Sequence, residues 1–225
     1  QFTVDSNKGR GRSEFACTPN HLLLTEDGYV PAGELEVGDT LVTAVKHYLT
    51  PAHEQVVLGS MLGDGSMRFA SDYNVQLRIG HGEKQTEYCK WKQSLFAGLV
   101  KYEGGNSRGG HSFDTIPMYE LAKLYEIGYK DGKKHPSFEL IDRLSPLAVA
   151  IWYMDDGTFD YVRQNRASIC CTGFDPEAQT ALVEWFHHHD IYPRLDSYGR
   201  INFNSKETPK FHKMIDYCLE TGSDF

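Results

Sequence analysis

The chain carries one helix-forming pattern twice, and this duplication restricts its fold more than any other feature. "LTPAHEQVVLGSMLGDG" and "LSPLAVAIWYMDDG" each open with a hydroxyl residue followed by proline, and each close with aspartate and glycine. Thr or Ser is a favourable helix cap, Pro suits the first helical position, and Gly commonly follows the last turn. The patterns therefore predict apolar helices from Thr50 to Gly65 and from Ser145 to Gly157.

The segments after the two helices repeat as well. Each predicted helix is followed by two short runs of strand-like alternation, an amphipathic helix, two more such runs and a last helix. The matching aspartates, Asp64 and Asp156, lie 92 positions apart. Self-similarity at a fixed spacing indicates a duplicated unit. We therefore predict an α+β fold with two α-β-β-α-β-β-α halves, residues 47–144 and 145–225, preceded by β-hairpins in residues 1–46.

Each predicted helix ends in a negative charge, which is mildly unfavourable against the helix dipole. Asp64 and Asp156 would be simple polar ends if the helices served only the core, but their repetition favours a shared function. Small residues let helix backbones approach closely, and both helices contain them: Gly59, Gly63, Ala148 and Ala150. If the helices pack side by side in the same direction, the two carboxylates meet.

Two neighbouring carboxylates repel each other unless cations neutralise them. Hard oxygen ligands suit Mg²⁺, whose octahedron is completed by water and phosphate oxygens. Backbone carbonyls of Gly63 and Asp155 could add ligands. Metal ions that bridge a scissile phosphate stabilise both the attacking and the leaving oxygen. The pattern therefore predicts metal-assisted phosphodiester hydrolysis, with Asp64 and Asp156 as the metal-binding acids.

A net charge of −8 argues against a phosphate-binding protein, but the charge is unevenly distributed. The expected strands with their turns, residues 66–81, 100–116, 158–173 and 192–206, hold nine basic and five acidic residues, so they carry +4 and the remainder −12. Positive charge therefore gathers where a DNA-facing sheet needs it. Arg can pair with guanine and Gln with adenine. The DNA-binding candidates are Arg68, Gln76, Arg78, Arg108, Arg163, Arg166, Arg194, Arg200, Asn204 and Lys206.

"VLGSMLGDG" (57–65) and "VAIWYMDDG" (149–157) resemble the paired signature helices of the single-chain LAGLIDADG homing endonucleases, although the first departs from the signature at several letters. The resemblance covers residues 48–225. It implies a monomer with two pseudo-twofold halves, whose two antiparallel sheets bind a long asymmetric site in double-stranded DNA. It also implies that Asp64 and Asp156 are the catalytic acids. The implied cofactor is Mg²⁺ or Mn²⁺, with Ca²⁺ as a substitute that supports no cleavage.

"GKKHPSFEL" (132–140) is similar to the Lys-x-Pro segment that lies between the signature helices of intein-borne members of this family. The likeness implies that Lys134 is a catalytic lysine that polarises the attacking water or steadies the developing negative charge. Lys133 is the adjacent alternative, and a solvated basic loop would carry no function. The second half has no such segment, and its counterpart stays open among three residues: Arg200, Asn204 and Lys206. A missing second lysine would make cutting of the two strands unequal.

"CTPNHLLLT", followed by "LEVGD", is similar to the Thr-x-x-His block of intein splicing (HINT) domains, with Thr18 and His21 at the matching positions. In that family the two residues help to activate the N-terminal splice junction. A capped turn with a core histidine would also produce the motif. The terminal splicing residues are not seen, since residue 1 is Gln and residue 225 is Phe. We therefore expect residues 1–46 to be a partial, all-β segment of an intein.

Other functional classes are less consistent with the composition. Five cysteines without Cys-x-x-Cys spacing suit a reducing compartment, and no apolar run approaches the roughly 18 residues that span a membrane. With the family likeness, this implies an intracellular protein with access to DNA. A catalytically silent DNA-binding protein of the same fold, such as a maturase or a regulator, is one alternative, and a splicing domain alone is another. The two acids with Lys-x-Pro argue against the first, and the terminal residues against the second.

Overall fold

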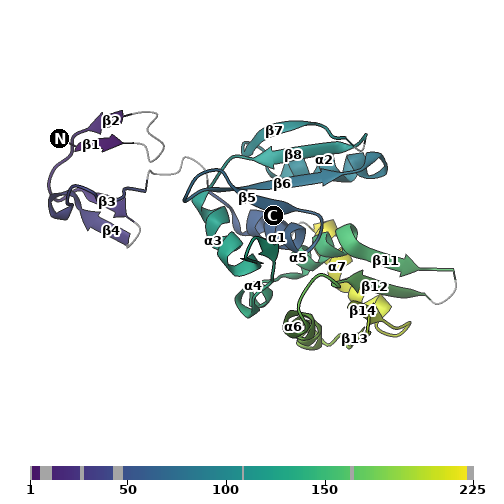
Figure 1. The fold of residues 1–225 in the computed structure, drawn as a ribbon. Helices are drawn as coiled ribbons and strands as arrows, with labels where there is room; N and C mark the ends of the chain where they lie inside the picture. The colour runs from purple at the N-terminus through teal and green to yellow at the C-terminus, as the bar shows by residue number, and fades with distance from the viewer. Residues whose placement is uncertain are drawn as a thin grey trace. The chain divides into compact units, whose positions relative to one another are not determined.

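The computed structural model describes six stretches of the chain, which are residues 2–5, 12–25, 28–42, 48–107, 109–162 and 165–221. The chain forms two compact units, residues 1–46 and residues 47–225 (Figure 1).

The first unit consists of two antiparallel hairpins. β1 (Phe2–Asp5) pairs with β2 (Arg12–Phe15), and β3 (Leu22–Thr25) pairs with β4 (Gly28–Pro31). A short 3-10 helix, η1 (Ala32–Glu34), follows β4. The predicted hairpins are confirmed. Ala32 is the only buried hydrophobic residue among those described in this unit, so its described part has little apolar core of its own.

The second unit contains the predicted order of elements twice. The first half consists of α1 (Pro51–Leu62), β5 (Ser66–Phe69), β6 (Val75–His81), η2 (Glu83–Gln85), α2 (Thr86–Leu95), β7 (Val100–Gly105), β8 (His111–Thr115) and α3 (Tyr119–Gly128). The second half consists of α5 (Pro146–Asp156), β11 (Gly157–Asp160), β12 (Arg166–Cys170), α6 (Pro176–His187), β13 (Arg194–Leu195), β14 (Arg200–Phe203) and α7 (Thr208–Thr221). The elements between the halves were not predicted from the sequence: β9 (Tyr129–Lys130), β10 (Lys133–Lys134) and α4 (Phe138–Asp142).

Each half builds a four-stranded antiparallel sheet with the same strand order. The first sheet runs β5-β6-β8-β7 and the second runs β11-β12-β14-β13. α2 and α3 contact the first sheet, whereas α5 and α6 contact the second. The matching order confirms the α+β fold and the duplicated core.

Both central helices begin as predicted. The hydroxyl of Thr50 accepts a hydrogen bond from the backbone N–H of His53 at 3.2 Å, and the hydroxyl of Ser145 accepts one from Leu147 at 3.2 Å. Each cap satisfies a backbone donor that the first turn leaves unpaired. α1 ends at Leu62 rather than at residue 65, because the backbone of Gly63 leaves the helical conformation with φ −95° and ψ −132°.

α1 and α5 pack against each other almost backbone to backbone. A Cβ atom placed on Gly59 would lie 2.7 Å from the Cβ of Ile151 and 3.0 Å from the carbonyl carbon of Ala148. A Cβ atom on Gly63 would lie 2.8 Å from the Cγ of Asp155. Neither space admits even a methyl group, so both glycines are required by the close approach of the helices.

The two helices run in the same direction. At their starts, the side-chain amide of Gln55 donates to the carbonyl of Arg143 at 3.0 Å and accepts from the N–H of Ser145 at 2.8 Å. Gly59 then meets the middle of α5 and Gly63 meets its end. Figure 1 shows the pair at the centre of the second unit, between the two sheets. The sequence-based prediction of a parallel pair is therefore correct.

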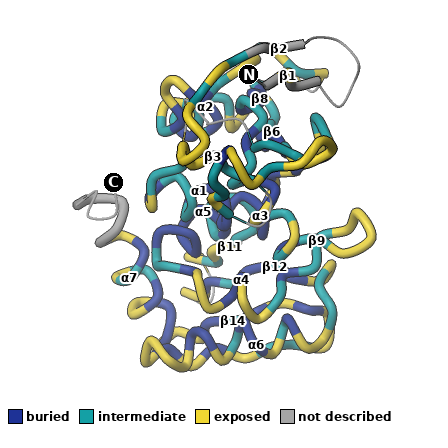
Figure 2. Tube along the Cα trace, turned by 90° about the vertical axis from the view of Figure 1, so that its left-hand side faces the viewer, coloured by how far each residue is buried: buried dark blue, intermediate teal, exposed yellow. Residues whose placement is uncertain are grey.

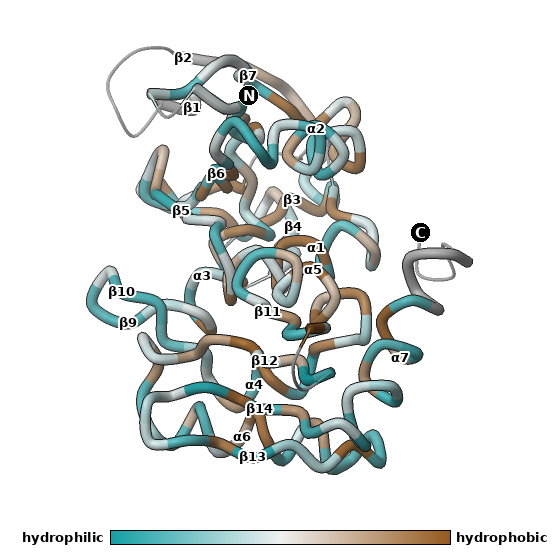
Figure 3. The backbone as a smooth tube through the Cα atoms, turned by 90° about the vertical axis from the view of Figure 1, so that its right-hand side faces the viewer, coloured by the Kyte–Doolittle hydropathy of each residue, from teal (hydrophilic) through white to brown (hydrophobic). Residues whose placement is uncertain are grey.

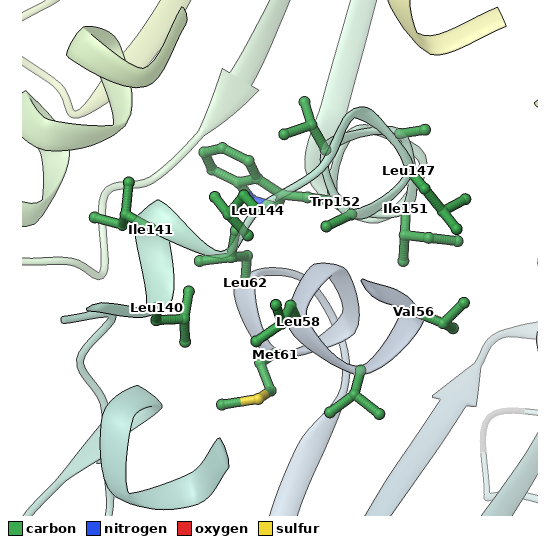
Figure 4. Packing of buried hydrophobic residues seen from close by; sticks show 14 of the residues in the cluster. Val56, Leu58, Met61, Leu62, Leu140, Ile141, Leu144, Leu147, Ile151 and Trp152 are labelled. Carbon is green, nitrogen blue, oxygen red and sulfur yellow. The ribbon is translucent and has the colours of Figure 1, made fainter. Parts of the chain in front are cut away.

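One buried hydrophobic cluster extends through both halves (Figure 2). Hydrophobic stretches occur among the helices and strands of both halves (Figure 3). Figure 4 shows the side chains around the helix pair: Val56, Leu58, Met61 and Leu62 of α1, Leu147, Ile151 and Trp152 of α5, and Leu140, Ile141 and Leu144 beside them. Among the residues that the structure describes, no helix has the length and apolar character needed to cross a membrane.

We expect Gly59→Ala to lower the free energy of unfolding by about 1–3 kcal/mol, because the added methyl group must push α1 away from α5. Gly173→Ala is the matched control, since a Cβ there would meet no atom within 4 Å; we expect it to change stability by less than about 1 kcal/mol. Urea denaturation followed by circular dichroism measures both. Equal stability of the two variants would contradict the close packing.

Candidate active site

The ends of α1 and α5 bring the predicted acids together. The backbone N–H of Asp64 donates to the Oδ2 of Asp155 at 3.0 Å, which joins the two helix ends directly. Asp156 directly follows Asp155 on α5, so it lies at the same joined helix ends as Asp64. The side chain of Asp64 is 45% exposed, and its Oδ2 lies 3.4 Å from Nδ1 of the buried His81. The two central helices therefore bring Asp64 and Asp156 to the same end of the pair, and their shared role as metal ligands stays a prediction.

Asp155 is the centre of a buried polar network. Its side chain is fully buried and accepts hydrogen bonds from the ammonium of Lys92 at 2.7 and 2.9 Å and from the hydroxyl of Tyr88 at 2.8 Å. Burial lowers the pKa of Lys92, against the opposing effect of Asp155. Burial and the charge of Asp155 also raise the pKa of Tyr88, which stays protonated. This network holds Asp155 in place and carries the backbone of Asp64 with it.

The pKa values of Asp64 and Asp156 are shifted in opposite directions. The side chain of His81 is the largest influence on Asp64 and holds its pKa below the usual range. Burial, together with Asp64 and Asp155, raises the pKa of Asp156 to about 6. Above this pH Asp156 is charged at an energetic cost that a nearby cation would reduce.

Lys134 lies beside these acids, as the Lys-x-Pro pattern predicted. Its ammonium donates to the carbonyl of Gly63, the last residue before Asp64. Burial lowers the pKa of Lys134, while the charges of Asp156 and Asp64 oppose this shift. The neighbouring Lys133 is exposed. Lys134 is therefore the lysine of the segment that faces the carboxylates.

His81 is a member of the site that the sequence analysis did not identify. Its side chain is fully buried, with Nδ1 3.4 Å from the Oδ2 of Asp64 and Nε2 3.7 Å from the Oδ1 of Asp155. Neither ring nitrogen makes a hydrogen bond with the described part of the chain. The sequence does carry a signal for His81. Side chains of β6 point alternately to the two faces of the sheet, and Val75, Leu77 and Ile79 point to the core. His81 takes the next core-facing position, where an apolar residue is expected.

Lys92 and Tyr88 were also missed. Cys89 and Lys92 of α2 and Phe96, the residue after its end, share the spacing of a buried helix face, and all three are fully buried. A lysine in such a stripe needs a buried partner of opposite charge. The sequence alone did not show that the partner is Asp155, 63 positions away.

The donor set fits a divalent cation. Asp64 offers a partly exposed, readily ionised carboxylate, and Asp156 offers a carboxylate whose pKa burial raises despite the charges of Lys134 and Lys92. His81 offers an imidazole nitrogen that makes no hydrogen bond with the described residues. The side-chain oxygens of Asp155 are engaged by Lys92 and the other donors, and the carbonyl of Gly63 accepts from Lys134. The predicted ligand role of the carbonyls of Gly63 and Asp155 stays a prediction.

The polar face of the first sheet differs in detail from the expectation. Arg68, Gln76 and Arg78 do share that face, but all three converge on Asp114, at 3.1, 3.0 and 2.7 Å. Gln76 is buried, whereas both arginines are about half exposed. Asp114 thus fixes the two guanidinium groups at the surface of the sheet.

The polar face of the second sheet carries Arg166, Arg194 and Arg200, all exposed. Register places Arg194 opposite Asn202 and Arg200 opposite Cys170. Arg108 and Arg163 lie outside the described residues.

The structure does not identify a counterpart of Lys134 in the second half. The side-chain oxygen of Asn204 accepts from the backbone N–H groups of Lys206 and Glu207 at 2.8 and 3.1 Å, and so shapes the turn before α7. In the described ranges, no hydrogen bond or ion pair joins Arg200, Asn204 or Lys206 to Asp156. Lys134 itself follows the third helix of its half, on β10.

Thr18 and His21 lie in a turn of the first unit. The N–H of His21 donates to the carbonyl of Thr18 at 3.0 Å, and both residues are exposed. His21 is therefore not a core histidine of this turn.

A family model described as the LAGLIDADG DNA endonuclease family matches residues 54–215. Protein RecA of Mycobacterium shimoidei is 38% identical over 234 residues, which cover 96% of this chain and 55% of the relative. Protein RecA of Mycobacterium leprae (strain TN) is 42% identical over 235 residues, which cover 96% of this chain and 33% of the relative. The chain therefore spans about half of the first relative and a third of the second.

A solved structure shares the fold. The homing endonuclease I-WcaI bound to its DNA recognition sequence aligns with a TM-score of 0.63, over 76% of this chain and 83% of that chain, at 18% identity.

We expect Asp155→Asn to lower the free energy of unfolding by about 3–5 kcal/mol, because it leaves the buried ammonium of Lys92 without its counter-charge. The double variant Lys92→Met/Asp155→Asn removes both charges and should recover most of that loss. Glu87→Gln, which removes an exposed ion pair with Lys90 on the same helix, should cost less than about 1 kcal/mol. Urea denaturation measures all three, and a double variant as unstable as Asp155→Asn would contradict the charge pairing.

Proposed function

The chain belongs to the LAGLIDADG DNA endonuclease family, and from this premise we propose that it is a metal-dependent homing endonuclease that cuts both strands of a long asymmetric DNA site. The observation that carries the proposal is the junction of the two central helix ends. There the N–H of Asp64 contacts Asp155, Asp156 follows directly, and Lys134 donates to the carbonyl of Gly63. A silent DNA-binding protein of the same fold would not need three such groups at one point.

Asp64 and Asp156 are the proposed metal-binding acids. They come from equivalent places in the two halves, 92 positions apart, so each half contributes one carboxylate. A bound divalent cation, Mg²⁺ or Mn²⁺, supplies charge neutralisation at the phosphate and lowers the pKa of a bound water. Asp64 is ionised at neutral pH because its pKa is lowered, whereas Asp156 resists ionisation until about pH 6.

Lys134 is the proposed positioning and proton-exchanging residue. Its contact with the carbonyl of Gly63 fixes the ammonium next to the carboxylates. Burial lowers its pKa, which moves the amine closer to the range in which a proton can be exchanged at neutral pH. In its charged form, Lys134 would steady negative charge that develops on the phosphate.

The two sheets are the proposed DNA-binding surfaces. Arginines stand on the outward face of each sheet, whereas the inward faces are apolar. Two-stranded and larger β-surfaces fit the major groove. I-WcaI, whose fold is shared, is bound to its DNA recognition sequence in its structure, and this supports the proposal of double-stranded DNA as the partner of this chain.

Residues 1–46 are proposed to be part of an intein splicing domain, and residues 47–144 and 145–225 the two endonuclease halves. Support comes from the relatives named Protein RecA, which match 96% of this chain. An endonuclease-type chain within such a relative is the arrangement expected of an intein inserted in a host protein. The exposed positions of Thr18 and His21 suit residues that act on a neighbouring peptide bond.

We expect purified protein with Mg²⁺ to cut a DNA fragment in which the coding sequences on either side of its own insertion point are joined. Asp64→Asn and Asp156→Asn should each lower the cleavage rate at least about a hundredfold, equivalent to about 2.7 kcal/mol of transition-state stabilisation. Lys134→Met should lower it by about 10²–10⁴. Asp142→Asn, an exposed acid of α4, is the control and should leave the rate unchanged.

Two outcomes of the cleavage experiment would contradict the proposal. Cleavage that survives substitution of either acid would exclude the proposed site. Tight binding of the same fragment without cleavage, with Mg²⁺ or Mn²⁺ present, would favour a silent DNA-binding protein instead.

The DNA-binding surface makes a separate prediction. Replacing Arg166 or Arg194 with Gln should reduce the slope of log Kd against log salt by about one for each lost phosphate contact. Arg143→Gln is the control, because Arg143 pairs with Glu139 at the end of α4, away from both sheets. Titrations by fluorescence anisotropy in Ca²⁺ and increasing salt give the slopes. Slopes that stay equal to that of the parent protein would exclude this face.

A further inference from the structure

His81 occupies a position that the fold assigns to an apolar residue. β6 alternates, so His81 points to the same side as Leu77 and Ile79, both of which are completely buried. Its backbone is fixed by the neighbouring strand and by Asn106, whose side-chain amide donates to the carbonyl of His81 at 2.8 Å. The imidazole is thus held in place by the sheet, not by hydrogen bonds to its ring.

The ring is buried without a hydrogen-bond partner, which is costly for a polar group. Both nitrogens lack such a partner among the described residues, and Nδ1 lies 3.4 Å from the Oδ2 of Asp64. The ring of Tyr88 covers one side, with centroids 4.9 Å apart. Nδ1 of His81 and the carboxylate of Asp64 therefore lie close enough together to share one bound cation.

Asp155 does not supply that group. Its two oxygens already accept from Lys92, Tyr88 and the backbone of Asp64. Its Oδ1 is 3.7 Å from Nε2 of His81, beyond a normal hydrogen bond. The pair left with spare ligand capacity is therefore Asp64 and His81.

The second half lacks an equivalent imidazole. Ser66 and Thr158 are equivalent positions of the two halves, and in the sheets they pair with Arg78 and Ser168. Arg78 and Ser168 are therefore equivalent as well. Three places further along each strand, His81 corresponds to Cys171. From His81 and Cys171 onward, equivalent residues of the two halves are 90 positions apart, so Lys92 corresponds to Leu182 and Phe96 to Phe186.

This equivalence agrees with burial. Phe96 and Phe186 are both completely buried, as are Lys92 and Leu182 to within 1% exposure. Cys171 is buried, and its thiol donates to the carbonyl of Gly199 at 3.2 Å. The polar network of the first half is therefore replaced by apolar residues and a partnered thiol in the second.

We propose that His81 is a nitrogen ligand, through Nδ1, for a divalent cation carried by Asp64, and that the two halves of the site consequently differ in their metal preference. This inference rests on the proposed function, because it assigns a further ligand to the same site. An imidazole ligand favours later transition ions such as Fe²⁺, Ni²⁺ and Zn²⁺ over Mg²⁺ and Ca²⁺, whereas oxygen ligands alone suit Mg²⁺, Ca²⁺ and Mn²⁺. Asp156, with Lys134 beside it, offers oxygen alone. The buried Asp155 keeps the backbone of Asp64 next to His81.

The test uses Mn²⁺ and the full chain labelled with ¹⁵N in its histidines. Pulsed electron paramagnetic resonance of bound Mn²⁺ should show coupling to ¹⁵N, and this coupling should disappear in His81→Gln and in Asp64→Asn. Titration should show that His81→Gln weakens Mn²⁺ binding by at least about tenfold, the lower end of the loss for an outer-shell partner, while Ca²⁺ binding changes little. His111→Gln is the matched control: His111 lies opposite His81 in the sheet, but its ring hydrogen-bonds Gln93.

The outcomes separate this inference from the proposed function. Mn²⁺ that requires Asp64 but shows no ¹⁵N coupling in the parent protein would overturn the role of His81 and leave the acids in place. Mn²⁺ binding that is unaffected by Asp64→Asn, or no binding at millimolar Mn²⁺, would contradict both. The presence or absence of ¹⁵N coupling is measured on the parent protein, without any substitution. The role of His81 can therefore be decided even if the His81→Gln variant folds poorly.

Discussion

The close approach of α1 and α5 is the constraint on which the rest of the endonuclease-like unit depends. Gly59 and Gly63 carry no side chain because the other helix occupies that space, with the backbone of Ala148 at Gly59 and the side chain of Asp155 at Gly63. Since the helices run in the same direction, their acidic ends lie together rather than at opposite ends of the molecule. The two sheets diverge from this pair, one from each half, and each presents its arginines on its outward side. Packing by small residues thus sets both the position of the acids and the placement of the two surfaces around them.

Bringing like charges together is unfavourable, and the structure compensates unequally in the two halves. The charge of Asp155 is neutralised by Lys92 within a buried network. Asp155 therefore stabilises the contact between the two helix ends, whereas Asp64 is left available to ligands. Asp64 is stabilised as an anion, whereas Asp156 is destabilised as one. A chain with internal symmetry has therefore acquired chemically different half-sites, because α2 and β6 supply polar groups where α6 and β12 supply apolar ones. Asp155 therefore links the stability of the contact between α1 and α5 to the electrostatics of the site.

The repeat, the caps at Thr50 and Ser145 and the order of helices and strands along the chain could be predicted from sequence. Each follows from a local pattern: a hydroxyl before proline, a period of two, or a spacing of 92. The meeting of Asp64 with Asp156, and Lys134 beside them, followed from the repeat and the family likeness. The connection of β9, β10 and α4 was not predicted, because two-residue strands carry no periodicity. Lys92 and Tyr88 were missed because their partner, Asp155, is distant in sequence. His81 was missed because a polar residue at an apolar strand position does not show from sequence what lies beside it. The hydrogen bonds from Arg68, Gln76 and Arg78 to Asp114 were not predicted, because they depend on the register of the strands.

The most direct test of the central claim is a nuclear Overhauser measurement on methyl-labelled protein in solution. The parallel, close-packed pair predicts three contacts in order: the Gln55 side-chain amide with Ser145, the Gly59 Hα protons with the methyl groups of Ala148 and Ile151, and the Gly63 Hα protons with the β-protons of Asp155. Observation of all three would establish both direction and proximity. Contacts in the reverse order, or none from Gly59 and Gly63 to α5, would show that the carboxylates are not brought together by these helices.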